Sequence, residues 1–181
     1  MSGADSDVIN AKCDKFFAVF DVNGNGYIER QDIDLLKANV LKAGSVPPES
    51  AKAQTFNHEY DVLWRALVEA VDKDGDGRLS REEFRQALGG LHAAGMRDAL
   101  YRAAAAVHVA VDTDDDGVFR VEDLVHLYTT CGVPLDIAQS VAAGMDRNGD
   151  GTITTAEYAT AWTEYFTLDN DLDSRTYGPV L

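Results

Sequence analysis

Apolar side chains recur every three or four residues along most of the chain, and short polar stretches interrupt this pattern four times. The first apolar stripe runs up to one polar stretch and resumes beyond it, with Ile9, Cys13, Phe16, Phe17 and Phe20 before and Ile33, Leu36, Val40 and Leu41 after. The longest stripe leads into the second polar stretch through Phe56, Tyr60, Leu63, Trp64, Leu67 and Val71. A period of 3.6 residues is typical of amphipathic helices. The pattern therefore predicts a helix on each side of every polar stretch.

Glycine and proline mark where these helices end. Residues 44–48 contain two successive prolines, which cannot continue a helix, and Gly89-Gly90 forms a second break. Residues 91–111 are rich in alanine and carry no run of charge, so a flexible charged linker is absent here. We therefore expect two units, residues 1–93 and residues 94–181 with the C-terminal tail from Leu168, packed against each other.

The polar stretches share a twelve-residue pattern. They are DVNGNGYIERQD (21–32), DKDGDGRLSREE (72–83), DTDDDGVFRVED (112–123) and DRNGDGTITTAE (146–157). Each has Asp at position 1, Asp or Asn at positions 3 and 5, Gly at position 6, an apolar residue at position 8 and an acid at position 12. This is the spacing of an EF-hand calcium loop. Four copies, each flanked by predicted helices, are too many to be explained by chance.

Calcium requires six to eight hard oxygen ligands, and a loop this short surrounds the ion only if the backbone turns sharply at position 6, where glycine is favoured. Position 7 contributes a backbone carbonyl, so its side chain is free to vary. The expected ligand residues are Asp21, Asn23, Asn25, Tyr27, Glu29 and Asp32 in the first loop, Asp72, Asp74, Asp76, Arg78 and Glu83 in the second, Asp112, Asp114, Asp116, Val118 and Asp123 in the third, and Asp146, Asn148, Asp150, Thr152 and Glu157 in the fourth.

The apolar residues at position 8 predict how the loops associate. Ile28 should pair with Leu79, and Phe119 with Ile153, across short two-stranded bridges. Ser80 with Glu83, and Thr154 with Glu157, match the capping box that begins a helix. The predicted fold is all-α, with four EF-hands in two pairs packed into one compact globule and short two-stranded β bridges between paired loops.

Position 12 separates the loops into two kinds. Glu83 and Glu157 are long enough to bind an ion through both carboxylate oxygens, whereas Asp32 and Asp123 are one methylene shorter. If these aspartates bind through one oxygen, coordination approaches the octahedron that Mg²⁺ prefers. We hypothesise Ca²⁺ selectivity at the second and fourth sites, with Mg²⁺ tolerance or weaker Ca²⁺ binding at the first and third. The alternative is that the backbone moves inward and aspartate still binds through both oxygens.

The third loop departs further from the pattern. Arg120 occupies position 9, where a side-chain oxygen usually holds a ligand or its water, and a guanidinium has no oxygen to offer. Asp115 at position 4 partly offsets the added positive charge. The alternative is that Arg120 points into solvent and leaves room for a water molecule.

Charge and composition narrow the functional classes. The formal net charge is −15 and nearly half of the 31 Asp and Glu residues lie at ligand positions, so four Ca²⁺ ions, with eight positive charges, would bring it to −7. Nucleic acid and anionic membrane are therefore not expected as partners. The acidic N-terminus has no apolar core typical of a secretory signal, and no apolar run approaches the ~18 residues of a membrane span. We expect a cytoplasmic monomer.

Other chemistry has little support in the sequence. Cys13 and Cys131 lie far apart without zinc spacing, and they are interpreted as small core residues. His58, His92, His108 and His126 are scattered singly on helices, which is typical of structural histidines. No nucleophile–base pattern or phosphate loop occurs, so no enzymatic activity is expected.

The four loops, the wide spacing between the first two, the missing central linker and the aromatic-ended tail together resemble the sarcoplasmic calcium-binding protein family, and most closely its calerythrin-like prokaryotic branch in actinobacteria. The resemblance implies one compact globule that buffers or transports Ca²⁺. One departure concerns the second hand, which is typically degenerate in calerythrin-like proteins, whereas residues 72–83 here have every ligand in place. This favours four potential Ca²⁺ sites, with Mg²⁺ possible at the first and third.

Three functions follow from this resemblance and from the composition. A buffer is favoured because sensors with broad targets rely on methionine-rich grooves, and here only Met96 and Met145 follow Met1. The alternatives are a Ca²⁺ sensor that opens an apolar groove for a target protein, and a photoprotein-like binder of an apolar ligand lined by Trp64, Trp162 and Tyr60.

Overall fold

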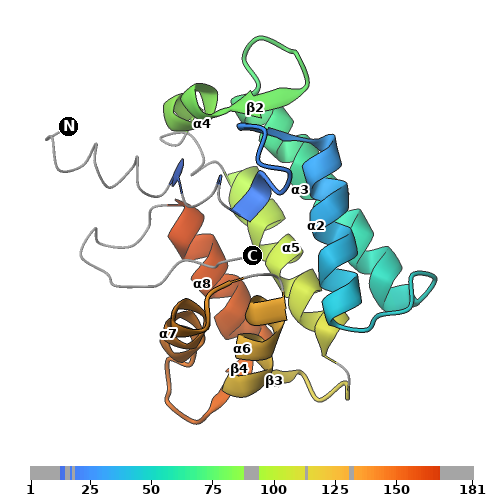
Figure 1. Cartoon of the computed structure of the whole chain (residues 1–181), viewed down its shortest axis with the longest axis vertical. Helices are drawn as coiled ribbons and strands as arrows, with labels where there is room; N and C mark the ends of the chain where they lie inside the picture. The colour runs from blue at the N-terminus through green and yellow to red at the C-terminus, as the bar shows by residue number, and fades with distance from the viewer. Residues whose placement is uncertain are drawn as a thin grey trace, which may run out of the picture.

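The computed structural model describes residues 19–87, 94–112, 114–130 and 133–167, together with residues 13, 14 and 17 (Figure 1). Its elements, in chain order, are β1 Tyr27–Glu29, α2 Arg30–Ala43, α3 Ala51–Val71, β2 Arg78–Ser80, α4 Arg81–Ala87, α5 Ala94–Val111, β3 Val118–Arg120, α6 Val121–Thr130, α7 Leu135–Met145, β4 Thr152–Thr154 and α8 Thr155–Thr167. The predicted all-α fold with short strand pairs is confirmed. The expectations for Ile9, Phe16, Gly89-Gly90, His92, Cys131 and the tail from Leu168 fall outside the described residues.

The break between α2 and α3 lies where the sequence predicts it. Helix α2 ends at Ala43, and its last carbonyls accept hydrogen bonds from the turn, among them Leu41 O from Val46 N at 2.8 Å. Ser45 takes a positive φ of 52°, which reverses the chain before the two prolines. Ser50 then caps α3 by accepting a hydrogen bond from Ala53 N at 3.1 Å. Helix α3 therefore starts as a new element in a new direction.

Helix α5 is the centre of the molecule, packed between α3 and α8 (Figure 1). Two of its faces are buried, and most of their residues are alanines: Ala99, Ala103, Ala106 and Ala110 at helical spacing, then Ala104 between Leu100 and Val107. Side chains of this size allow neighbouring helices to approach closely. Phe20, before the first loop, also meets Trp162 of α8 edge to face, with ring centroids 6.4 Å apart. The two halves therefore share one core, as expected.

The predicted strand pairs are also confirmed. β1 pairs antiparallel with β2 and places Ile28 opposite Leu79, and β3 pairs with β4 and places Phe119 opposite Ile153. All four side chains are buried. In Figure 1 the β2 end lies at the top of the molecule and the β3–β4 end at the bottom. The fold thus holds the twelve-residue loops in two pairs at opposite ends.

Two further expectations can be compared with the structure. Cys13 is fully buried, and burial raises the pKa of its thiol, consistent with a small core residue. No helix within the described parts of the chain is both long and apolar enough to cross a bilayer.

Candidate metal centres

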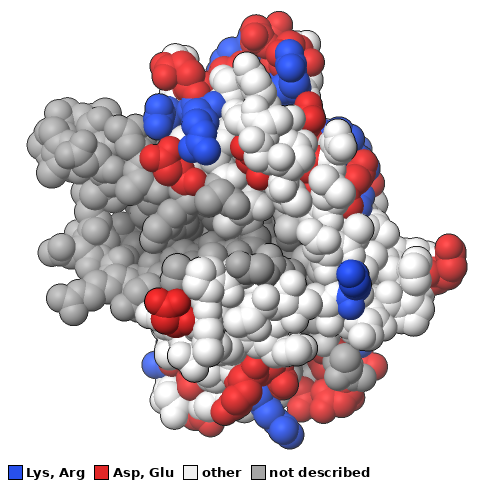
Figure 2. All heavy atoms as spheres, in the orientation of Figure 1, with Lys and Arg blue, Asp and Glu red and all other residues white. Residues whose placement is uncertain are grey.

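Acidic side chains gather over the two ends of the molecule that carry the loops. In Figure 2 red atoms lie mainly at the top and bottom of this face, with a largely uncharged band between them. The loops project from the helical core at these ends, so most of their carboxylates are at least partly exposed to solvent. This arrangement gives cations direct access to each loop.

The aspartate at position 1 closes every loop in the same way. Its Oδ2 atom accepts a hydrogen bond from the amide of the glycine at position 6. The four donor–acceptor distances are 3.0 Å for Gly26 to Asp21, 3.0 Å for Gly77 to Asp72, 2.9 Å for Gly117 to Asp112 and 2.9 Å for Gly151 to Asp146. These glycines have φ between +80° and +88°, a conformation that residues with a Cβ rarely adopt. The turn predicted at position 6 is confirmed in all four loops.

Side chains at positions 3 and 5 also turn inward. Position 5 accepts a hydrogen bond from the amide at position 7, for example Tyr27 N to Asn25 Oδ1 at 2.9 Å and Val118 N to Asp116 Oδ1 at 3.0 Å. In the second loop Asp72, Asp74 and Asp76 each place an oxygen within 4.8 Å of the others, and Asp112, Asp114 and Asp116 do the same in the third. Converging carboxylates of this kind repel one another unless a cation lies between them.

The fourth loop uses a hydroxyl to support its position-5 ligand. Thr152 donates from both its amide and its hydroxyl to Asp150 Oδ1, at 2.8 and 2.6 Å. These bonds hold the pKa of Asp150 below its usual range, so the carboxylate is ionised at neutral pH. Asn148 Oδ1 lies alongside and accepts from the amide of Asp150 at 2.8 Å.

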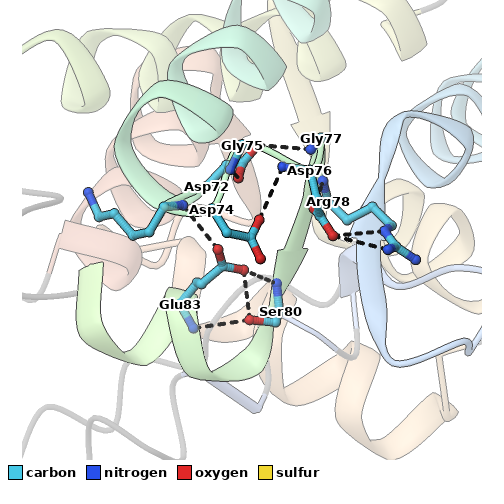
Figure 3. A network of polar contacts seen from close by, with 9 residues as sticks. Asp72, Asp74, Gly75, Asp76, Gly77, Arg78, Ser80 and Glu83 are labelled. Atoms are coloured by element: carbon cyan, nitrogen blue, oxygen red, sulfur yellow. Dashed lines mark hydrogen bonds and ion pairs between the residues drawn. The ribbon is translucent and has the colours of Figure 1, made fainter.

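The acid at position 12 is the third residue of the helix that follows each loop. In the second loop Glu83 Oε1 accepts from Lys73 N at 3.0 Å, while Oε2 accepts from the Ser80 amide at 2.9 Å and hydroxyl at 2.7 Å (Figure 3). Burial alone would raise the pKa of Glu83, but these hydrogen bonds outweigh it and lower the pKa. The predicted capping box is confirmed here, and that of Thr154 with Glu157 is confirmed in the fourth loop. Glu83 therefore caps α4 and faces into its loop at once.

In the first loop the acid at position 12 is an aspartate, and it is buried. Asp32 is fully buried, with Oδ1 accepting from Asn23 N and Oδ2 from Glu29 N, both at 3.0 Å. Glu29 at position 9 turns toward the same loop, and its Oε1 accepts from the side-chain amide of Asn25 at 3.0 Å. All the side chains expected to bind an ion in this loop are therefore brought together.

The third loop borders a cleft of about 300 Å³ that also reaches residues of the α2–α3 turn. The cleft brings together the expected ligand residues Asp112, Asp114, Asp116, Val118 and Asp123, and Arg120 also lines it. Asp112 is only 7% exposed, and its Oδ1 is buried without a hydrogen-bond partner among the described residues. Burial would raise the pKa of Asp112, but the hydrogen bond from the Gly117 amide and the nearby Lys52 cation lower it. A buried, ionised oxygen without a partner fits the position of a bound cation.

Two residues shape the sites in ways that sequence reasoning missed. The Arg78 guanidinium donates to Asp76 Oδ2 at 3.2 and 3.0 Å (Figure 3). It also lies over the Tyr27 ring of the paired loop. The loop pattern assigns position 7, which Arg78 occupies, a backbone carbonyl ligand and gives its side chain no role. Lys52 of α3 lies against the third loop, sixty residues further along the chain. Nothing in the local sequence signals this contact.

The chain is similar to several calcium-binding proteins. A family model described as an EF-hand domain pair matches residues 11–89, and one described as an EF hand matches residues 145–161. The probable calcium-binding protein CML25 of Arabidopsis thaliana is 30% identical over 158 residues, which are 85% of this chain and 74% of that protein. Calerythrin of Saccharopolyspora erythraea is 24% identical over 151 residues, 81% of this chain and 85% of that protein.

A solved structure agrees over nearly the same range. A calcium-binding protein of Streptomyces coelicolor superposes with a TM-score of 0.79 at 32% identity, covering 88% of this chain and 98% of that chain.

Proposed function

The chain belongs to the EF-hand calcium-binding proteins, in the sarcoplasmic and calerythrin-like group, and from this premise we propose that it is an intracellular Ca²⁺ buffer or transporter with up to four sites. Ca²⁺ binding is common to the relatives, which are calcium-binding proteins and not enzymes. The observation that carries the proposal is the shared closure of all four loops, in which the aspartate at position 1 accepts the glycine amide at position 6.

In this proposal each ion is bound by the side chains at positions 1, 3, 5 and 12 and the carbonyl at position 7, with Glu29 adding an oxygen in the first loop. The sites with Glu83 and Glu157 select Ca²⁺, and the sites with Asp32 and Asp123 also accept Mg²⁺. The burial of Asp32 supports this division, because the shorter side chain is fully buried whereas Glu83 is partly exposed.

Buried methionines support a buffer rather than a sensor. A sensor exposes an apolar groove when it binds Ca²⁺, and methionine is favoured in such grooves. Met96 and Met145 are 4% and 1% exposed, respectively. Helix α5 is packed on both sides, so opening either hand pair would break contacts in the shared core. A protein built in this way binds Ca²⁺ with little change of its surface, acts as a monomer and needs no target.

One observation favours the sensor as a second candidate. The similar Streptomyces coelicolor protein is described in connection with prokaryotic calcium-mediated regulation. A regulatory role for this chain would require a Ca²⁺-dependent surface that binds another protein.

The photoprotein-like alternative has less support. Tyr60, Trp64 and Trp162, which would line the cavity for an apolar ligand, are 2%, 8% and 3% exposed and belong to the packed core. Visible absorbance of a chromophore copurified with the protein would revive this alternative.

The test is a Ca²⁺ titration at millimolar Mg²⁺, followed by fluorescence of a dye that reports exposed apolar surface. A buffer gives flat or falling fluorescence, and a clear rise rejects it in favour of the sensor. In parallel, the amide resonances of Gly26, Gly77, Gly117 and Gly151 report each site, because a bound cation polarises the carboxylate that each amide contacts. Glu83→Gln and Glu157→Gln are the controls, each removing the position-12 carboxylate from one Ca²⁺-selective site.

A further inference from the structure

The third loop is the one that the first half of the chain touches. Lys52, in the first turn of α3, places its ammonium 2.7 Å from Asp115 Oδ1 and donates to the backbone carbonyl of Asp112. The turn before α3 reaches the same place, because a Cβ on Gly44 would lie 2.6 Å from Val111 Cγ1, one residue before the loop. Two independent contacts therefore hold residues of the first half against this loop.

Lys52 contacts the loop through atoms outside the expected ligand set. The set uses the side chain of Asp112, not its backbone carbonyl, and position 4, which Asp115 occupies, supplies no ligand. The lysine therefore leaves the ligand oxygens of the third loop available. Asp115 also neutralises the ammonium, so the pair adds little net repulsion toward a cation.

Position 4 explains why the loop needs an external support. In the other three loops this position is Gly24, Gly75 or Gly149, with φ between +71° and +76°. In the third loop Asp115 takes φ of +59° with a Cβ present, which aspartate tolerates better than most residues but less readily than glycine. The ion pair with Lys52 stabilises Asp115 in this conformation, and Asp112 is held at the same time through its carbonyl.

We propose that Lys52 is a positioning residue for the third metal site, acting from the other half of the chain to hold the loop closed and so to raise its affinity for Ca²⁺. The inference rests on the proposed function, since it assigns a determinant of affinity to one of the four sites. A loop already held in its binding shape loses less conformational entropy when the ion arrives.

The experiment is a Ca²⁺ titration of the full chain followed by the Gly117 amide, with Lys52→Met compared with the wild type. We expect the Ca²⁺ concentration at half-saturation to rise about fivefold or more for Gly117, the loss expected from one charge-assisted hydrogen bond and one ion pair. It should change less than about twofold for Gly26 and Gly77 in the other pair. In Ca²⁺-free protein, the same variant should speed hydrogen exchange at the Gly117 amide, because the loop opens more often.

Three further variants sharpen the test. Arg102→Met removes another positive charge that pairs across α3 and α5, with Glu59 at 2.9 Å, and should leave Gly117 unchanged. Lys52→Arg keeps the charge and should restore most of the affinity. In an Asp115→Gly background Lys52→Met should shift Gly117 less than it does in the wild type, because the ion pair is already absent, glycine adopts a positive φ without strain, and only the hydrogen bond to the Asp112 carbonyl remains to be lost.

Unchanged or tighter binding at Gly117 in Lys52→Met would overturn the inference, since the lysine would then be neutral or repulsive. The inference would also be overturned if the Gly117 amide resonance of the wild type did not change with Ca²⁺ while those of the other three glycines did. The protein would then be a buffer with three sites. If none of the four glycine amide resonances changed with Ca²⁺, the proposed function itself would be rejected.

Discussion

One methylene group at position 12 separates two kinds of loop in this protein. Asp32 and Glu83 both accept a backbone amide on each carboxylate oxygen, yet Asp32 is one methylene shorter and fully buried, whereas Glu83 is partly exposed. A carboxylate held back in this way favours binding through one oxygen, which suits the lower coordination number of Mg²⁺.

Asp32→Glu should therefore make the first site more selective for Ca²⁺. The longer side chain reaches the ion with both oxygens, as Glu83 is expected to do, and Mg²⁺ tolerates this geometry poorly. The measurement is the Ca²⁺ midpoint of the Gly26 amide with and without millimolar Mg²⁺, and the gap between the two should narrow by about tenfold. Glu83→Asp is the matched control and should widen the gap at Gly77. An unchanged gap in Asp32→Glu would mean that the aspartate already binds through both oxygens.

His108 is a second residue whose surroundings set a measurable property. It is fully buried on α5, with Nε2 3.0 Å from Ile153 O and Nδ1 3.0 Å from Thr155 Oγ1. Its ring also lies against Phe119, with centroids 3.9 Å apart. The structural role expected of this histidine is therefore confirmed, and the contacts tie α5 to both strands of the second bridge.

Burial lowers the pKa of His108 below its ordinary value of 6.5. The unfolded chain then takes up a proton at higher pH than the folded one, so the stability that neutral His108 contributes is complete above pH about 6.5 and is lost as pH falls below it. In urea unfolding of Ca²⁺-free protein, the wild type should lose more stability between pH about 7.5 and about 5.5 than His108→Gln does. The titration of carboxylates is common to both proteins and cancels in the comparison. Equal losses would show that His108 takes up its proton at the same pH in the folded and unfolded chains.

At the scale of elements, the β bridges join the loops in pairs. Ile28 meets Leu79 in the first bridge, and each strand spans positions 7 to 9 of its loop, starting at the residue whose carbonyl is expected to bind the ion. A loop that tightens around an ion therefore moves the strand of its partner. Coupling between sites that share a rigid element typically amounts to about 1–3 kcal/mol.

Glu83→Gln should weaken not only the second site but also the first. Removing one carboxylate charge leaves the second loop unfilled, and β2 then no longer favours the bound form of β1. We expect the Ca²⁺ midpoint of the Gly26 amide to rise by about fivefold or more, and that of Gly151 in the other pair to change by less than about twofold. Equal shifts at Gly26 and Gly151 would contradict pairwise coupling through the bridge.

The bridges and loops could be predicted because their determinants are local. The ligands of one site lie within twelve residues, and the pairing of Ile28 with Leu79 follows once the apolar residue at position 8 is recognised. The contact of Lys52 with the third loop could not be predicted, because it depends on how α3 crosses α5. The burial of Asp32 was hidden for the same reason, since side-chain depth is set by packing and not by spacing.

At the scale of the whole molecule, the packing of α5 decides whether the halves behave as one body. Helix α5 belongs to the second half in sequence but contacts α3 of the first, and Phe20 extends the shared core to Trp162. The arrangement supports units 1–93 and 94–181 that unfold together, in contrast to lobes joined by a free linker.

The two tryptophans allow this cooperativity to be measured. Trp64 lies in α3 and Trp162 in α8, so Trp162→Phe leaves a reporter in the first half and Trp64→Phe leaves one in the second. In urea the two single-tryptophan proteins should unfold with coincident transitions by fluorescence and circular dichroism. Adding Phe20→Ala should lower the stability of both by a similar amount, about 3–5 kcal/mol, because it empties a buried site at the junction of the halves. If Phe20→Ala moved the Trp64 transition and left that of Trp162 in place, the halves would be separate cooperative units. In that case Lys52 could support the third site only while the first half remained folded. The affinity of the third site would then depend on the stability of the first half.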